Sequence, residues 1–164
     1  TGAWGSIEHA QLVAHADIPR FARLGVTASV QPVHALDDRD LTDALWAGQT
    51  AQPYPLQALV AAGANVTFGS DAPVSPLDPW AAISAAVFRT RGDREPWEAP
   101  ERVSAEVALA ASTHRGSADP DVIAPGAVAD LALVASDPLA AGERELREMP
   151  VVATLLGGRL THLA

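Results

Sequence analysis

The stretch Asn65-Val66-Thr67-Phe68-Gly69-Ser70-Asp71 decides the fold class, because it combines a short apolar strand with a polar turn at its end. The pattern before it predicts a helix over residues 54–62, which Gly63 ends. A second helix is predicted after it, over residues 78–89, with Asp78 as the N-cap. A strand set between two helices is the repeating unit of parallel α/β folds.

The same alternation continues toward the N-terminus. Residues 26–30 form the next predicted strand, residues 17–24 a helix with an apolar stripe, and residues 6–10 another strand. Strands joined by helices predict parallel pairing with right-handed crossovers. The polar segment 34–52 is expected to be a loop, with at most a turn or two of helix over residues 41–47.

The C-terminal part has a different pattern. A helix is expected over residues 104–113, then a loop, then a strand over residues 130–134. Residues 151–163 predict a hairpin around Gly157-Gly158. We therefore expect an α/β part over residues 1–115 and a small antiparallel β segment over residues 116–164.

Composition excludes several classes of function. The net charge is −9, so the clustered positive charge needed to bind nucleic acid is absent. There is no cysteine, so any metal site must use His, Asp or Glu. No apolar run reaches the ~18 residues of a membrane span, so we expect no membrane partner. The cytoplasm is the default expectation for the location of the chain.

Two ionisable residues stand where parallel α/β folds collect their chemistry, at the carboxyl ends of strands. His9 closes the first predicted strand and Asp71 follows the third. With strands ~4.8 Å apart, the two side chains are predicted to lie within about 10 Å of each other. Imidazole and carboxylate suit Zn²⁺ and similar ions. The alternatives are a hydrogen-bonded structural histidine and an aspartate that caps a turn.

Five short motifs follow one another along the chain. Residues 7–10 read I-E-H-A, residues 31–35 read Q-P-V-H-A, and residues 68–74 read F-G-S-D-A-P-V. Residues 125–131 read P-G-A-V-A-D-L, and residues 157–159 read G-G-R. In their order and spacing these motifs resemble those in the C-terminal part of the metal-dependent amidohydrolases of amidohydrolase family 3, the YtcJ-like group.

This resemblance implies a fold and a site. The chain would be the C-terminal part of a (β/α)8 TIM-like barrel, about strands six to eight, followed by a small β-sandwich segment. His9 would be a metal ligand, and Asp71 both a metal ligand and the catalytic proton shuttle. His34, in the loop after the second strand, would contact the substrate, with packing of the loop as the alternative. The implied cofactor is a divalent metal, zinc, with one or two ions in the whole protein and a chain that can be metal-free by itself.

The implied reaction is hydrolysis of a non-peptide C–N bond, amide or N-formyl in type, through metal-activated water. The family's H-x-H motif, its bridging residue and one further histidine have no counterpart here, and the chain has no lysine. We therefore expect the isolated chain to be inactive. The alternatives are an incompetent remnant that acts in folding or assembly, and a binding module.

The expected partners are a small amide-type substrate and other protein. We expect a homo-oligomer, or association with the missing N-terminal part. The reason is an expected exposed barrel interior lined by Val26, Ala28, Val30, Val66 and Phe68.

The remaining candidates have structural interpretations. Asp38 and Asp40 are expected to be solvated or capping, with pocket lining as the alternative. His15 and His162 are expected on the surface, and His114 at a helix C-terminus, where a cation is favourable. Glu8 should point away from His9. The tryptophans are expected in the core or a pocket wall: Trp4, Trp46, Trp80 and Trp97.

Overall fold

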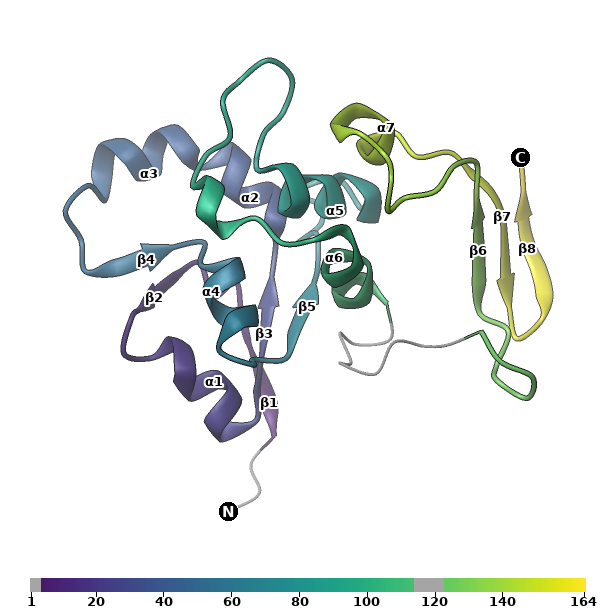
Figure 1. Cartoon of the computed structure of the whole chain (residues 1–164), viewed down its shortest axis with the longest axis horizontal. Helices are drawn as coiled ribbons and strands as arrows, with labels where there is room; N and C mark the ends of the chain where they lie inside the picture. Colours follow the sequence, from purple (N-terminus) through teal and green to yellow (C-terminus); the bar gives the residue numbers. More distant parts are fainter. Residues whose placement is uncertain (1–3, 114–122) are drawn as a thin grey trace.

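The chain forms a mixed α/β body and, beside it, a separate antiparallel sheet (Figure 1). The structure is a computed structural model that describes residues 4–113 and 123–164. The expected boundary near residue 115 and His114 both lie outside the described residues. None of the helices in the described parts of the chain has the length and apolar character of a membrane-spanning segment.

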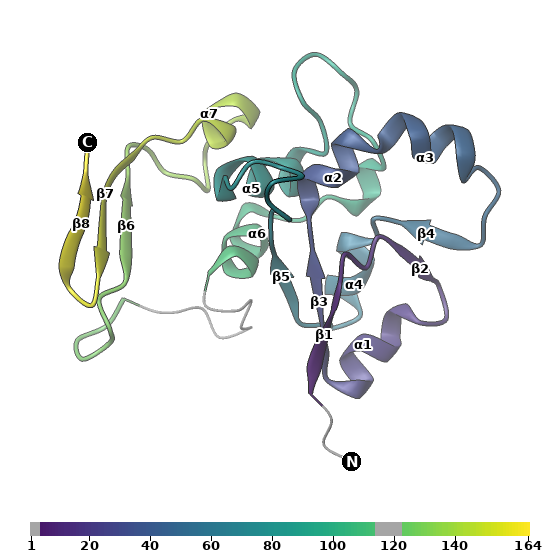
Figure 2. The same cartoon turned by 180° about the vertical axis from the view of Figure 1, so that it is seen from behind.

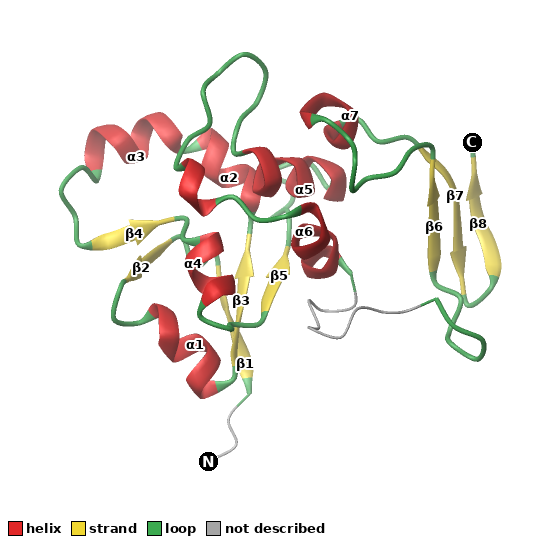
Figure 3. Ribbon diagram, in the orientation of Figure 1, coloured by secondary structure: helices red, strands yellow, loops and turns green. Residues whose placement is uncertain are grey.

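The centre of the body is a parallel sheet in the order β1-β3-β5, as the strand-helix alternation predicted (Figure 3). Its strands are β1 (Gly5–Glu8), β3 (Val26–Val30) and β5 (Val66–Phe68). The register aligns Ile7 with Ala28, and Ala28 with Val66. The carboxyl ends of all three strands therefore meet at one edge of the sheet.

Helices begin and end largely where the capping residues predicted. The helices are α1 (Ile18–Leu24), α4 (Leu56–Ala61), α5 (Pro79–Phe88) and α6 (Ala105–Ser112). The Asp78 carboxylate accepts hydrogen bonds from the backbone N–H groups of Trp80 and Ala81, which fixes the start of α5. Asp17 stands at the start of α1 but makes no capping bond, and its carboxylate pairs with Arg20 instead.

The segment expected to be mostly loop is more ordered than the sequence indicated. It contains α2 (Pro32–Asp37) and α3 (Arg39–Leu45). It ends in β4 (Ala51–Pro53), which pairs antiparallel with β2 (Leu12–Ala14). Three-residue strands that pair across about forty positions leave no periodicity to recognise, because the contact that forms them is not local.

One face of the central sheet is apolar and covered by helices. Ala28, Val30 and Val66 are buried in a cluster that includes Phe21 and Leu59. Val26 and Phe68 pack against the same cluster. The expectation that these five strand residues line an exposed inner face was therefore wrong, because they point into the helical layer.

The opposite face of the sheet is polar. Since side chains alternate along a strand, it carries the residues between the apolar ones: Ser6, Glu8, Thr27, Ser29 and Thr67. The Asn65 side chain donates to the Thr27 hydroxyl at 2.9 Å. Hydrogen bonds from Ser29 and Ser6 hold the pKa of Glu8 below its usual value, so Glu8 has the structural role that was expected. The sheet thus has one apolar face that packs against helices and one polar face.

The C-terminal sheet is antiparallel, as predicted, and is seen from behind in Figure 2. It consists of β6 (Leu131–Val134), β7 (Val151–Leu156) and β8 (Arg159–Leu163). Gly157 and Gly158 have φ of 57° and 77°, the left-handed conformation that a tight hairpin turn requires. An unexpected helix, α7 (Glu143–Arg147), attaches this part to the body, since Leu146 is fully buried in the main core.

Candidate metal centre

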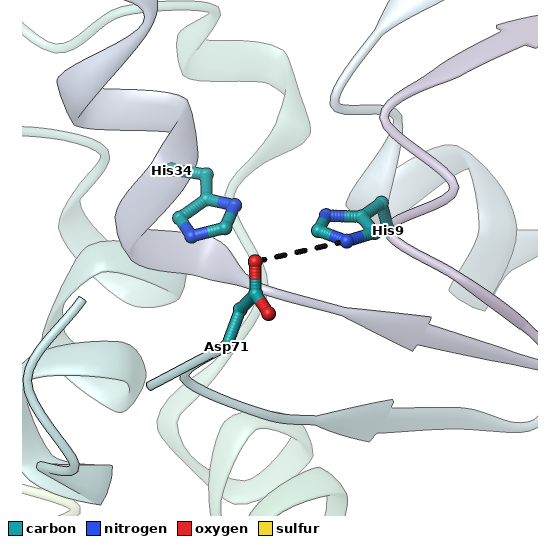
Figure 4. Close-up of side chains that lie close together, drawn as sticks. All are labelled: His9, His34 and Asp71. Carbon is teal, nitrogen blue, oxygen red and sulfur yellow. Dashed lines mark ion pairs between the residues drawn. The ribbon is translucent and has the colours of Figure 1, made fainter. Parts of the chain in front are cut away.

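His9 and Asp71 meet at the carboxyl edge of the parallel sheet (Figure 4). His9 follows β1 directly and Asp71 stands in the turn after β5. His9 Nε2 lies 3.8 Å from Asp71 Oδ2, so the prediction that the two side chains converge within about 10 Å is confirmed.

The backbone at both residues is in a conformation that L-residues seldom adopt. His9 has φ of 67° and Asp71 of 55°. A non-glycine residue in the left-handed region costs of order 1–3 kcal/mol and persists only where the surroundings impose it. The fold therefore directs these two side chains toward each other against the local preference of the chain.

The pair is suited to hold a divalent cation. Two ligand atoms about 2.1 Å from one tetrahedral ion lie about 3.4 Å apart. The 3.8 Å between His9 Nε2 and Asp71 Oδ2 needs only a small adjustment to reach that value. Both side chains are 41% exposed, so an ion from solvent can reach them. The exposure also means that the ion pair by itself contributes little to folding, because water screens it.

His34 lies next to this pair, on a helix rather than in the expected loop. It belongs to α2, which packs on α5 through Val33, Ala82 and Ala85. Its ring stacks on that of His9, with ring centroids 5.6 Å apart and an interplanar angle of 22°. One potential ligand atom from each of His9, His34 and Asp71 lies within 4.8 Å of the others.

The His34 ring is almost completely enclosed. The residue is 7% exposed, and its Nε2 is buried without a hydrogen-bond partner in the described structure. The two nearly parallel rings thus place His34 directly beside the His9–Asp71 pair.

The acidic residues that follow His34 do not join this cluster. Asp38 accepts a hydrogen bond from the Tyr54 hydroxyl. Asp40 forms an ion pair with Arg94 at 2.6 Å, and the hydrogen bond from that guanidinium lowers the pKa of Asp40. Asp40 is nevertheless exposed, so the expectation that it is solvated is confirmed, whereas Asp38 makes no side-chain capping bond and is held by Tyr54 instead.

The other candidates are placed as follows. His15 and His162 are exposed, as expected. Trp97 is buried and its indole N–H donates to Asp43, while Trp80 packs against the main core. Trp4 is 92% exposed, so its expected place in the core or a pocket wall was wrong.

The sequence did not reveal a small cavity that borders the site. His9 lines it together with Gln31, Tyr54 and Arg89. Tyr54 and Arg89 are distant in the sequence from the motif residues and follow no recognised motif of their own. Their positive φ values, 45° and 54°, are visible only in the folded chain.

Comparison with known proteins assigns the family. The sequence matches the amidohydrolase family over residues 1–162. It is 33% identical to Protein LONG AFTER FAR-RED 3 of Arabidopsis thaliana, over 93% of this chain and 28% of the relative. It is 28% identical to the N-substituted formamide deformylase of Arthrobacter pascens, over 95% of this chain and 30% of the relative. The chain thus spans less than a third of either relative's length.

Solved structures show the same fold. An uncharacterized metal-dependent hydrolase from Pyrococcus furiosus aligns with a TM-score of 0.54 and 34% identity, covering 68% of this chain and 22% of that one. The zinc complex of atrazine chlorohydrolase TrzN from Arthrobacter aurescens TC1 aligns with a TM-score of 0.63 and 23% identity, covering 96% of this chain and 36% of that one. The family match, together with the paired His9 and Asp71 at the edge of a parallel sheet, leads to one conclusion: this chain belongs to the amidohydrolase family.

Proposed function

We propose that this chain supplies His9 and Asp71 to the active site of a metal-dependent hydrolase that cleaves small-molecule C–N bonds. The observation that carries the proposal is the 3.8 Å approach of His9 Nε2 to Asp71 Oδ2, at the strand ends of a chain that matches the amidohydrolase family. In this proposal β1, β3 and β5 correspond to strands six to eight of a (β/α)8 barrel. The polar face of the sheet would look into that barrel, and β6 to β8 would belong to a β-sandwich.

The proposed substrate class follows from one relative. The Arthrobacter pascens protein is, by its name, a deformylase of N-substituted formamides. We extend that bond type, an amide or N-formyl C–N bond in a small molecule, to the protein that carries this chain. Two features of the site are compatible with it: a carboxylate that can exchange protons and an imidazole that lies beside it.

Each residue would have a separate role in the hydrolysis. A bound divalent ion, zinc in our proposal, would act as a Lewis acid and lower the pKa of water toward neutrality. His9 would hold that ion through neutral imidazole Nε2. The Asp71 carboxylate would take a proton from the attacking water and return it to the leaving nitrogen. Oxygen thus adds to the acyl carbon, the C–N bond breaks and the amine leaves protonated.

We propose that His34 contacts the substrate. Its buried ring is stacked on that of His9, and the helix that carries it packs on α5 through Val33, Ala82 and Ala85. The remaining metal ligands would come from the part of the relatives that this chain does not span. On this proposal the isolated chain has no turnover.

Metal content and turnover test these roles. Zinc bound per chain is measured after dialysis for the wild type, His9→Ala, Asp71→Asn and the control His162→Ala. Loss of zinc in His9→Ala and Asp71→Asn, but not in His162→Ala, supports the proposed site. Turnover of N-formyl and N-acyl amines by the isolated chain, lost on both His9→Ala and Asp71→Ala, would contradict the proposal that further ligands are needed.

A second candidate function, assembly with other protein, is favoured by a groove along the edge of the body. The groove lies between β1 and α1 and has a volume of about 290 Å³. Among its lining residues, Ile7, Leu12 and Leu24 are 50%, 39% and 55% exposed. We propose that either a second copy of this chain or the rest of the barrel covers these side chains, since burying apolar surface is favourable.

A further inference from the structure

A small cavity borders the metal centre on the side of His9. Its volume is about 20 Å³, and its polar lining comes from His9, Gln31, Tyr54 and Arg89. The rest of the wall is apolar and includes Val30 and Leu59. A cavity must offer at least about 10–15 Å³ to hold one water molecule. This cavity is therefore large enough for one water molecule and too small for a substrate.

Two of the lining residues carry polar atoms that lack partners. Arg89 is 1% exposed, and its Nη2 is buried without a hydrogen-bond acceptor in the part of the chain that the structure describes. Gln31 is 6% exposed, and its Oε1 is likewise without a donor there. Buried polar atoms are nearly always paired, with protein or with ordered water, so both atoms need an explanation.

The guanidinium of Arg89 is fixed by its other contacts. Its Nε donates to the Trp97 carbonyl oxygen at 3.1 Å, and its central carbon lies 5.3 Å from the centroid of the Trp97 ring. Burial lowers the pKa of Arg89 to about 10, so the group is still charged at neutral pH. The unpaired Nη2 is thus a charged donor that cannot turn away to find another partner.

The two unpaired atoms determine which ligand the cavity can take. A donor and an acceptor must be satisfied together, and the guanidinium repels any cation. An anion could accept from Arg89 but could not donate to the Gln31 oxygen, and an apolar group would leave both unpaired. Water does both. We propose that one ordered water molecule occupies this cavity, accepts a hydrogen bond from Arg89 Nη2 and donates one to Gln31 Oε1, and that Gln31 and Arg89 are positioning residues of the metal centre.

The positioning role rests on the proposed function and on two further contacts. His9 lines the same cavity, so it borders the proposed water. The Gln31 amide nitrogen lies against the turn that carries Asp71, since a Cβ built on Gly69 would be 3.6 Å from it. Holding Gln31 through the water would therefore fix both sides of the His9–Asp71 pair.

The strained backbone of this region supports the same interpretation. Six non-glycine residues of the described chain have positive φ: His9, Ala10, Tyr54, Asp71, Arg89 and Glu98. Four of them line the cavity, and a fifth, Asp71, pairs with His9. Such strain persists where surrounding structure over-determines it. Unusual backbone geometry is thus concentrated around the cavity and the metal centre.

The first test detects the water itself. Water-proton magnetic relaxation dispersion reports long-lived buried water and is compared between the wild type, Gln31→Met and Arg89→Met. The matched controls are Gln49→Met and Arg102→Met, which change exposed residues of the same types. We expect the dispersion amplitude to fall by one water molecule in the two cavity variants and not in the controls. An unchanged amplitude in both cavity variants would overturn the water assignment. So would ³⁵Cl relaxation showing that the wild type holds a chloride ion that both cavity variants lose.

The second test separates positioning from mere structure. Cobalt affinity is measured for both single variants and for the double variant, with urea midpoints to identify variants that do not fold and Arg89→Lys as a milder replacement. We expect each single change to weaken cobalt binding by 10-fold or more, as for other residues that support metal ligands. The double variant should be no weaker than the worse single variant, because both act through one water.

His9→Ala serves as the reference in this second experiment. If His9→Ala loses cobalt while Gln31→Met and Arg89→Met bind like the wild type, the positioning role is wrong and the metal site remains. If His9→Ala binds cobalt like the wild type, the proposed metal site itself fails, and the relaxation result still decides whether the water is there.

Discussion

The two faces of the central sheet can be tested with a pair of neighbouring substitutions, Ala28→Asp and Thr27→Asp. Ala28 is 0% exposed and lies between Ile7 and Val66 in the register, on the face that the helices cover. Thr27 is half-buried on the opposite, polar face. The two variants introduce the same carboxylate one residue apart, so they differ only in the face that receives it.

The expected cost at Ala28 follows from burial of the charge. Full burial raises the pKa of a carboxyl group by about 3–5 units. At 1.36 kcal/mol per unit this is about 4 kcal/mol at neutral pH, because a carboxyl group whose folded pKa exceeds 7 becomes protonated and the cost rises no further. A domain of this size is stable by about 5–15 kcal/mol in total. Ala28→Asp should therefore remove a large part of the free energy of unfolding.

The expected cost at Thr27 is far smaller. The face is open to water, and the new carboxylate can still accept the hydrogen bond that the Asn65 side chain donates to the Thr27 hydroxyl. What remains is the weaker strand preference of Asp, about 1 kcal/mol or less. The two variants should thus differ by at least about 3 kcal/mol.

Urea unfolding followed by tryptophan fluorescence measures the difference, since Trp97 is buried and Trp80 packs on the core. With a urea slope of about 1–3 kcal/mol per molar, Ala28→Asp should lower the midpoint by 1 M or more relative to Thr27→Asp. A carboxyl group whose folded pKa is raised destabilises most above that pKa, and the electrostatic cost vanishes below the unfolded value of about 3.9. Equal losses for the two variants at neutral pH would show that our assignment of the sheet faces is wrong.

Three further predictions concern a cap, an ion pair and an interface. Asp78→Ala should lower the free energy of unfolding by about 1 kcal/mol, because α5 loses the carboxylate that accepts hydrogen bonds from the backbone N–H groups of Trp80 and Ala81. In the same thermal melt the control Asp93→Ala, in an exposed turn, should have no measurable effect. Arg94→Gln should raise the pKa of Asp40 toward its ordinary value in an NMR titration, since the Arg94 hydrogen bond keeps that pKa low. Any stability that the pair contributes is present above the unfolded pKa of Asp40 and is lost as the pH falls through its folded pKa. An unchanged Asp40 titration would refute the contact. Light scattering should show association of the isolated chain at micromolar concentration. Leu24→Glu in the groove should reduce it, and Leu41→Glu, at an exposed position of α3, should not. A well-folded monomer with sharp thermal unfolding would contradict self-association through the groove.

Much of the fold could be predicted because its signals are local. In the strands β3 and β5 apolar residues alternate with small polar ones, and the chain turns at Gly25 and Gly63, which both have the positive φ of a helix end. Asp78 and Ser104 cap their helices within three residues. The alternation of these elements is enough to imply parallel strands, and parallel strands bring His9 and Asp71 to one edge.

Other features depend on contacts between distant segments, so only the tertiary structure decided them. The pairing of β2 with β4 joins residues about forty positions apart, and α7 is a single short helix that is held by its contact with α5. The alternation within β3 shows that Ala28 and Thr27 face opposite sides. Only the helices packed on Ala28 decide which side is the core, and the sequence interpretation chose the wrong one.

The site divides in the same way. His9 and Asp71 could be found in the sequence, because each stands next to a strand end within a short motif. The stacking of His34 on His9 and the cavity between Gln31 and Arg89 could not, because the packing of α2 and α5 against the sheet brings those side chains together. Local sequence patterns reflect the conformational preferences of a few consecutive residues. A cavity shared by several elements depends on how those elements pack, and that packing is determined by the burial of apolar surface over the entire chain.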